Sequence, residues 1–363
     1  MNARFTGPRA LAGSAYARGV AQASDPAVTE EQIHQAVIAP VRQAEEDGLL
    51  DSDARRFLKE QRTYNQAHAP LSLEEVQGIA RGFNLAFDDL FTYLHLGTLR
   101  DLHNSAPSQM DGCSAWATLN TDEGPTVVKN RDFSGQHVDV QRLTIHTGPD
   151  LSAGPMLCLG SLGAPGAYSS GMNAAGLAIA DTQIGTNHHG VGVLRYFLMT
   201  ELLRQCDSVE AALSWINRHH HAGGGSLILA DAHTVAAVEL GTTAVAIERG
   251  ETVFRTNHFI SPALAETTLH RHGYGIDENS SRRFDYLSAT LTGQSWSLAS
   301  IQQLMATHAS GEQGAPICQH PDSSGSRTLS SVILQSQSRR AYYLAGNPCS
   351  GQWHCVDWTI DPQ

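Results

Sequence analysis

The sequence predicts an α+β protein in which helices and strands occupy separate blocks of the chain. Residues 27–104 have helical periodicity, whereas short β-like runs separated by glycine-rich turns begin near Asp111. Two further helical blocks, near 193–219 and 280–308, interrupt these runs. Blocks of strands and helices in this order are typical of a layered α+β protein. We find no internal repeat and no low-complexity linker.

The N-terminal block should contain several helices. Thr29-Glu30-Glu31 opens a segment whose apolar residues recur at helical spacing. Ser72 and Glu75 match the capping-box pattern, which predicts a helix that begins at Ser72. Residues 87–96 continue the pattern, and their excess of apolar side chains predicts packing against a large surface.

The first strands should form a hairpin. Runs 115–120 and 126–130 are β-like, and the turn residues 121–125 join them. Within the helical block 193–219, Asp207 to Glu210 should start a second helix. Further strands are predicted at 140–147, 155–160, 177–180 after a tight turn at 173–176, four runs within 226–257, 328–335, 341–346 and 353–360.

Composition narrows the function classes. The formal net charge of −12 over 363 residues argues against nucleic acid or an anionic membrane as the main partner. No apolar run is long enough for a membrane span, and the first residues lack the apolar core of a secretory signal. The six cysteines are therefore expected to be reduced thiols, in a soluble cytoplasmic protein.

The step Gly112-Cys113 is the main chemical feature of the sequence. A thiol that follows a glycine can attack the carbonyl group of that glycine and split the chain. The cut would leave Cys113 with an α-amine of pKa about 7.7–8.0, which can take the thiol proton. This is the chemistry of an N-terminal nucleophile, and it needs no histidine near Cys113.

The predicted hairpin should bring a carboxylate to this cysteine. Asp132 lies on the returning strand and could orient the new amine. Lys129 or Arg131 alternates with Asp132 on the same strand, so one of them should point into the site. Taken singly, Cys113 could be a buried apolar residue and Asp132 a residue of a turn or rim.

Several short segments, taken together and in order, resemble the isopenicillin-N acyltransferase family. The resemblance covers most of the chain. Its segments are Gly13 to Gly19, Gly112 to Trp116, Asn130 to Phe133, Gly171 to Leu177, Thr256 to Phe259, Ile317 to Pro321 and Thr328 to Val332.

The resemblance implies a four-layer αββα N-terminal nucleophile hydrolase sandwich and a self-cleaving precursor. The products would be a helical α-chain, 1–112, and a catalytic β-chain, 113–363, within one globular unit. Cys113 would be the nucleophile, and Asp132 would orient its α-amine. Asn257 matches the family's oxyanion-hole asparagine. Main-chain N–H groups near Ala115 or Gln183 are candidates for a second donor.

Three arginines compete for a place beside the nucleophile. Arg283 looks like the arginine that the related choloylglycine hydrolases place there, although its neighbour Arg282 leaves the register open. Arg327 is a competitor. Lys129 stands where that related group has an arginine facing the cysteine, so a cation is kept without the planar guanidinium. A surface salt bridge is an equally good reading of each arginine.

These residues predict an amidohydrolase or acyltransferase that works through a Cys113 acyl-enzyme. Its partner would be a small amide or thioester substrate, with Lys129, Arg131, Gln183 and Arg327 binding or supporting it. The α- and β-chains should stay associated, and a homo-oligomer is compatible with the sequence. No cofactor is expected. The alternative is a non-catalytic or uncleaved small-molecule-binding protein on the same fold.

Other motifs carry weaker hypotheses. Residues 188–189 and 219–221 are histidine runs, while Cys318-Gln319-His320 and His354-Cys355 add potential metal ligands. Because no C-x-x-C pair, H-E-x-x-H motif or repeated ligand spacing is present, no metal site is predicted. Residues 223–226 are glycine-rich but lack the lysine of a phosphate-binding loop.

Overall fold

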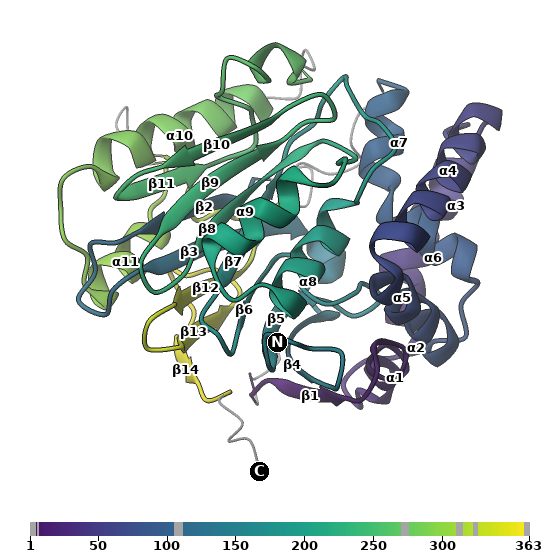
Figure 1. Cartoon of the computed structure of the whole chain (residues 1–363), viewed down its shortest axis with the longest axis horizontal. Coiled ribbons are helices and arrows are strands. Elements are labelled where there is room, and N and C mark those ends of the chain that lie inside the picture. The colour runs from purple at the N-terminus through teal and green to yellow at the C-terminus, as the bar shows by residue number, and fades with distance from the viewer. Residues whose placement is uncertain are drawn as a thin grey trace.

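A computed structural model describes residues 5, 7–104, 112–269, 276–309, 315–321 and 326–358 of the chain. Two β-sheets are stacked on each other, and helices cover their outer faces (Figure 1). This is the expected α+β class, in the four-layer αββα arrangement. Among the described residues, no helix has both the length and the apolar character required to cross a membrane.

The first sheet has eight strands in the order β1-β4-β5-β6-β7-β8-β9-β10. Strand β1 joins β4 in parallel, whereas the other neighbours are antiparallel. The sequence analysis did not predict β1, so the N-terminal segment contributes a strand as well as helices. The strands are β1 (Arg9–Ala12), β4 (Gln141–Thr147), β5 (Met156–Ser161), β6 (Ser170–Asn173), β7 (Ala178–Gln183), β8 (Gly225–Ala230), β9 (Val235–Leu240) and β10 (Val245–Arg249).

The second sheet has six strands in the order β11-β2-β3-β12-β13-β14. The predicted hairpin is confirmed, since β2 and β3 pair in antiparallel with Ser114 opposite Asn130. The last strand is shorter than the predicted run 353–360, of which residues 359 and 360 lie outside the described part. The strands are β2 (Ser114–Thr118), β3 (Thr126–Ser134), β11 (Thr252–Arg255), β12 (Ser326–Gln335), β13 (Arg340–Ala345) and β14 (His354–Val356).

Successive side chains of a strand point to opposite faces of its sheet, and this alternation forms the core on both faces. On β2, Ala115 and Ala117 face the other sheet, while Trp116 faces the outer helices. The outer helices are α8 (Arg195–Gln205) and α9 (Val209–Asn217) on the eight-stranded sheet, and α10 (Ile276–Leu291) and α11 (Leu298–Met305) on the six-stranded sheet. The second helix predicted at 207–210 is confirmed, because Ser208 caps α9.

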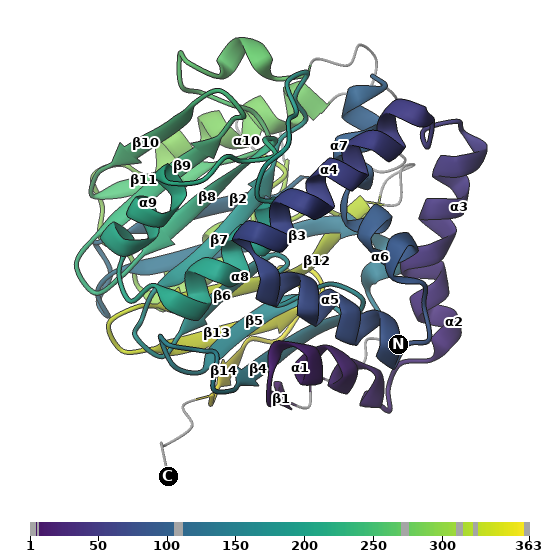
Figure 2. The ribbon, with the colours of Figure 1, turned by 45° about the vertical axis from the view of Figure 1, so that its right-hand side comes forward.

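The N-terminal helices cover one end of the eight-stranded sheet (Figure 2). Residues 30–46 are continuously helical, with Thr29 and Gln32 forming a capping box and a π-helical turn between α2 and α3. The helices are α1 (Ala15–Ala21), α2 (Glu30–Ile33), α3 (Ala39–Glu46), α4 (Ser52–His68), α5 (Pro70–Gly82), α6 (Phe87–Leu94) and α7 (Leu96–Leu102).

The predicted cap at Ser72 is wrong. Helix α5 starts two residues earlier, because Pro70 occupies its first turn and has the fixed φ that suits this position. Ser72 lies inside the helix and donates a hydrogen bond to Oε1 of Glu201, 2.9 Å away. Glu75 is buried and accepts from the backbone N–H of Gly166 at 3.0 Å.

A buried ion pair fastens helix α1 to the β-sheet region of the chain. Both guanidinium NH₂ groups of Arg18 donate to the carboxylate of Asp150, each at 2.7 Å, and one also donates to the carbonyl oxygen of Gly13 at 2.6 Å. Arg18 is almost wholly buried, whereas Asp150 retains some exposure. The pair joins the segment before Gly112 to the segment after it.

Replacement of Arg18 by methionine should therefore destabilise the protein by about 3 kcal/mol, because it leaves Asp150 without its cation in a mostly buried position. The measurement is the free energy of unfolding in urea. Arg42→Met is the matched control, since Arg42 pairs with Glu45 and Asp89 at the surface and should change stability by less than about 1 kcal/mol. Equal effects of the two variants would contradict this role for the pair.

Candidate active site

Cys113 directly precedes strand β2 and lies in the interior of the molecule, with only 7% of its surface exposed. Its thiol donates to the carbonyl oxygen of Asp132, with Sγ 3.6 Å from that oxygen. The hairpin therefore brings Cys113 beside the main chain of Asp132. A small cavity of about 30 Å³ adjoins the thiol. Its lining includes Cys113, Lys129, Arg131, Asp132, Phe133, Tyr168, Ser169, Asp181, Gln183, Arg195 and Tyr196.

Lys129 and Arg131 both line this cavity, whereas only one of them was expected to, because residues two apart on a strand share a face. The Lys129 ammonium forms a buried ion pair with Asp181 and donates to the carbonyl oxygen of Ser169 at 3.3 Å. Arg131 donates to the carbonyl oxygen of Gly160 at 3.0 Å and to Oγ of Ser161 at 2.8 Å. Both cations are thus held in place by groups of the opposite sheet.

Asp181 links Lys129 to a second cation. Nε of Arg195 donates to Oδ2 of Asp181 at 2.7 Å, and the two positive charges lower the pKa of Asp181 against the effect of its burial, which raises it. The other end of Arg195 reaches the amide oxygen of Gln183 at 3.3 Å. Sequence reasoning missed Asp181 and Arg195, which lie outside the segments that carried the family resemblance.

Arg283 projects from helix α10 and is completely buried against the nucleophile. Its guanidinium donates to the carbonyl oxygen of Cys113 at 2.5 Å, to Oγ of Ser114 at 3.1 Å and to Oδ1 of Asn257 at 2.8 Å. Burial lowers the pKa of Arg283 to about 10, while interaction with Asp132 and Cys113 in their ionised forms acts in the opposite direction. The side chain is therefore still a cation at neutral pH.

The same arginine fixes the orientation of Asn257. A guanidinium can only donate, so the amide oxygen of Asn257 must face Arg283 and the NH₂ group must face away. One hydrogen of that NH₂ group is donated to the carbonyl oxygen of Gln183 at 2.8 Å. An amide NH₂ has a second hydrogen, which Asn257 can present to a reacting oxygen. Asn257 thus contacts the backbone of Gln183, a residue that lines the cavity.

Asp132 is buried between the end of β3 and two polar side chains. A β-bulge in β12 sets Thr328 directly opposite it, and Nε2 of Gln319 donates to Oδ2 of Asp132 at 2.8 Å. Burial raises the pKa of Asp132 to about 7, against the opposing effects of Thr328, Arg283, Gln319 and Lys129. Within the described part of the chain, its second oxygen, Oδ1, is buried without a hydrogen-bond partner.

Gln319 is a site residue to which the sequence analysis gave no role, although its segment carried part of the resemblance. Besides Asp132, its Nε2 donates to the carbonyl oxygen of Gly112 at 2.8 Å, the carbonyl that the thiol would attack. The contact requires glycine at position 112, because a Cβ there would lie 1.9 Å from Nε2 of Gln319. No sequence spacing indicated this contact, since the two residues are far apart in the chain.

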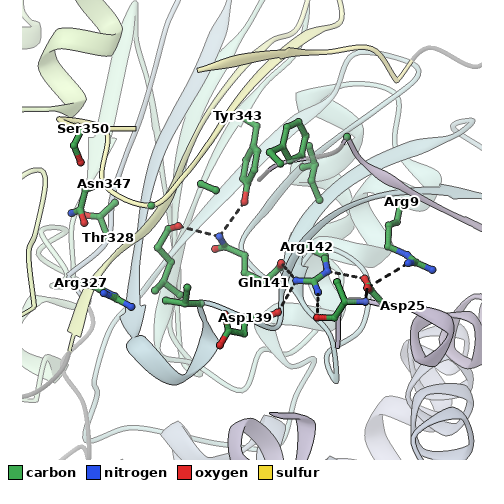
Figure 3. Close-up of a pocket in the computed structure, with 18 of the residues that line it drawn as sticks. Arg9, Asp25, Asp139, Gln141, Arg142, Arg327, Thr328, Tyr343, Asn347 and Ser350 are labelled. Atoms are coloured by element: carbon green, nitrogen blue, oxygen red, sulfur yellow. Dashed lines mark hydrogen bonds and ion pairs between the residues drawn. The ribbon is translucent and has the colours of Figure 1, made fainter. Parts of the chain in front are cut away.

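The other two arginines lie elsewhere. Arg282 is exposed, whereas Arg283 beside it is buried at Cys113, so the register left open by the sequence is now defined. Arg327 lines a separate cavity of about 290 Å³, together with Arg9, Asp25 and others (Figure 3). The structure therefore does not bring Arg327 into the Cys113 cavity. Thr328, its neighbour in β12, borders the larger cavity and also faces Asp132.

The larger cavity has no cysteine among its described lining residues. Arg142 and Arg9 both pair with Asp25, with Nε of Arg142 2.7 Å from Oδ2 of that carboxylate (Figure 3). Gln141 donates to the hydroxyl oxygen of Tyr343 at 3.2 Å. Cys113, the expected nucleophile, lines the smaller cavity together with Asp132.

The raised pKa of Asp132 predicts a pH-dependent effect of Asp132→Asn. Between pH 4 and 7 the folded protein keeps a proton on Asp132 that the unfolded chain, with the ordinary pKa of 3.8, has released. As the pH rises through this window, the free energy of unfolding of the protein with Asp132 therefore falls relative to that of Asp132→Asn. The fall is at most about 4 kcal/mol. Urea unfolding at a series of pH values measures the difference.

Both proteins should carry Cys113→Ala, so that neither can cleave itself during the measurement. Asp122→Asn, in the exposed β2–β3 turn, is the matched control for loss of a carboxylate. A stability difference between the proteins with and without Asp132→Asn that stays constant from pH 4 to 8 would contradict the raised pKa.

Comparison with known proteins places the chain in a family. A sequence model described as acyl-coenzyme A:6-aminopenicillanic acid acyl-transferase matches residues 119–350, which begin after Cys113. No curated protein matches.

Solved structures that are similar include a mutant of conjugated bile acid hydrolase from Clostridium perfringens. It shows 11% identity, a TM-score of 0.42, and coverage of 68% of this chain and 97% of that one. Penicillin V acylase from Agrobacterium tumefaciens shows 14% identity, a TM-score of 0.37, and coverage of 68% and 86%. Because the family match spans more than half of the length of this chain, the chain belongs to the acyl-coenzyme A:6-aminopenicillanic acid acyl-transferase family.

Proposed function

We propose that the chain is a precursor that cuts itself between Gly112 and Cys113 and then acts as an amidohydrolase or acyltransferase. The observation that carries the proposal is the pair of hydrogen bonds on the two carbonyls that flank this peptide unit. Gln319 donates to the oxygen of Gly112, and Arg283 donates to the oxygen of Cys113. The main chain is thus held at Gly112 and at Cys113, the two residues that the bond to be cut joins.

The cleavage would be an acyl shift from nitrogen to sulfur. Sγ of Cys113 attacks the carbonyl carbon of Gly112, and the developing oxyanion receives the hydrogen bond from Nε2 of Gln319. The bond from that carbon to the nitrogen of Cys113 then breaks, and the nitrogen takes the thiol proton. Water hydrolyses the resulting thioester, which leaves a carboxylate on Gly112 and a thiol and free α-amine on Cys113.

The new amine would find its partner in Asp132. Oδ1 of Asp132 is a buried acceptor, and an α-amine with a pKa of about 7.7–8.0 is a donor to a carboxyl group of similar pKa. Asp132 would therefore hold the amine beside Sγ, in a position to accept the thiol proton during turnover. This assigns Asp132 the role that the sequence predicted for it.

Turnover would repeat the chemistry on a substrate. The thiolate of Cys113 attacks an amide or thioester carbonyl, Asn257 donates its second N–H to the oxyanion, and the leaving amine or thiol departs with the proton from the α-amine. Water then releases the acyl group in a hydrolase, and an amine accepts it in an acyltransferase. Arg283 would hold the side chain of Asn257 and the backbone of Cys113 in place throughout the reaction.

Lys129, Arg131 and Gln183 would shape the substrate pocket. Their polar ends are tied to Asp181, Ser161 and Arg195, which supports a positioning role for all three. Arg327 is not assigned to this pocket, since it lines the larger cavity.

After the cut, chains 1–112 and 113–363 would stay together. Strand β1 is part of the eight-stranded sheet, and Arg18 pairs with Asp150. A reducing compartment such as the cytoplasm would suit an enzyme that depends on a free thiol.

The proposal is tested by trapping the acyl-enzyme from a panel of N-acyl-4-nitroanilides. Rapid acid quenching should give a chain that starts at Cys113 and is heavier by the acyl group. In Asn257→Ala, kcat for release of 4-nitroaniline should fall by about 10²–10³, because the oxyanion loses a donor, while the chain remains folded and cleaved.

Asn217→Ala, at the exposed end of α9, is the matched control and should keep the wild-type rate. A change confined to KM in Asn257→Ala would assign that residue to substrate binding. Acylation of a residue other than Cys113, or turnover by Cys113→Ala, would overturn the proposal.

A further inference from the structure

Four potential metal ligands meet at one point on the surface, outside the Cys113 cavity. His308 follows helix α11, Cys318 and His320 lie between α11 and β12, and Cys349 lies in the turn after β13. Their ligand atoms all lie within 4.8 Å of one another. Cys318 is buried and the other three are exposed. The sequence analysis noted Cys318 and His320 but had no reason to join them to residues 308 and 349.

The separations fit a small tetrahedral site. Nε2 of His320 lies 3.1 Å from Nε2 of His308, 3.3 Å from Sγ of Cys349 and 4.0 Å from Sγ of Cys318. With Zn–N bonds of about 2.0–2.1 Å and Zn–S bonds of about 2.3 Å, a tetrahedral site has ligand atoms about 3.3–3.8 Å apart. The observed distances bracket these values.

The kind of ligand selects the metal. Two thiolates and two imidazoles form an S₂N₂ set, which is typical of zinc, and four protein ligands close the site to substrate, as in structural zinc sites. Two thiolates also balance the charge of Zn²⁺, with the two thiol protons lost to solvent.

We propose that His308, Cys318, His320 and Cys349 bind one zinc ion. A supporting shell is in place, because Nδ2 of Asn347 approaches Sγ of Cys318 at 3.4 Å and donates to the carbonyl oxygen of Gln319 at 2.6 Å. Such outer contacts orient the ligands of protein metal sites. The other histidine runs are used differently: His219 stacks on Trp215, and His221 contacts the carbonyl oxygen of Ile216.

The zinc would have a consequence for the neighbouring active site. Cys318 and His320 flank Gln319, whose side chain holds the Gly112 carbonyl and Asp132. Coordination on both sides would restrict the backbone of Gln319 and keep its amide in position. Gln319 would then be positioned by the metal, which itself touches no reacting atom. This second step rests on the proposed function, whereas zinc binding does not.

Zinc binding is tested on the full chain carrying Cys113→Ala, which cannot cleave itself, so that the result does not depend on the proposed function. After incubation with zinc and removal of the excess, elemental analysis should give about one zinc per chain. Cobalt(II) in place of zinc should give the visible absorption of a tetrahedral thiolate site. Added Cys349→Ser or His308→Ala should abolish both signals.

Cys355→Ser is the matched control, an exposed cysteine outside the cluster, and should retain about one zinc per chain. Circular dichroism checks that the variants are folded. The fold should tolerate these substitutions, because His308 and Cys349 are exposed. The proposal is overturned if the Cys113→Ala chain binds neither metal, if Cys349→Ser and His308→Ala bind both normally, or if Cys318 and Cys349 are found joined as a disulfide.

The link to Gln319 is tested in chains that retain Cys113. Cys349→Ser should lower the rate of cleavage at Gly112 at least several-fold, and Cys355→Ser should not. If the chain with all four ligands binds zinc, Cys349→Ser does not, and both cleave at the same rate, the positioning step alone is overturned. Bound zinc in a chain that never cleaves would overturn the proposed function and leave the zinc site standing.

Discussion

The arrangement around Cys113 depends on the buried guanidinium of Arg283. This one group joins helix α10 to the start of β2 and to Asn257, which follows β11. Because it donates at every contact, it turns the amide oxygen of Asn257 toward itself and the NH₂ group toward the backbone of Gln183. Nε of Arg283 donates to Oδ1 of Asn279 at 2.7 Å, so the side chain is anchored within its own helix as well. An uncharged residue in its place would leave several buried oxygens without donors.

The two faces of strand β3 carry different residues of the site. Lys129 and Arg131 point toward the other sheet, where Asp181 and Ser161 hold them. Asn130 points toward the helical layer and donates to the carbonyl oxygens of Met305 and Ile317 at 3.0 and 2.8 Å. Asp132 follows on that second side and meets Gln319. The alternation of a single strand therefore builds both a cationic cavity wall and the polar support for the Gly112–Cys113 bond.

Local patterns predicted the parts of the molecule that local physics determines. The turn at 121–125 fixed the β2–β3 hairpin, and with it the approach of Cys113 to Asp132. Strand β1 escaped prediction because its partner, β4, is distant in sequence. The cap at Ser72 was wrong because Pro70 starts the helix first. Burial of Arg283 rather than Arg282, the separation of Arg327, the contact of Gln319 with Gly112 and the His–Cys cluster all arise from tertiary packing, which sequence spacing does not encode.

The most direct test of the central claim is the intact mass of the purified protein beside that of Cys113→Ala. The wild-type chain should separate under denaturing conditions into fragments 1–112 and 113–363, and the variant should remain a single chain of 363 residues. A wild-type chain that stays whole on prolonged incubation would contradict self-cleavage and leave Cys113 without its α-amine. Cleavage of the variant at the same bond would show that another nucleophile, or a contaminating protease, makes the cut.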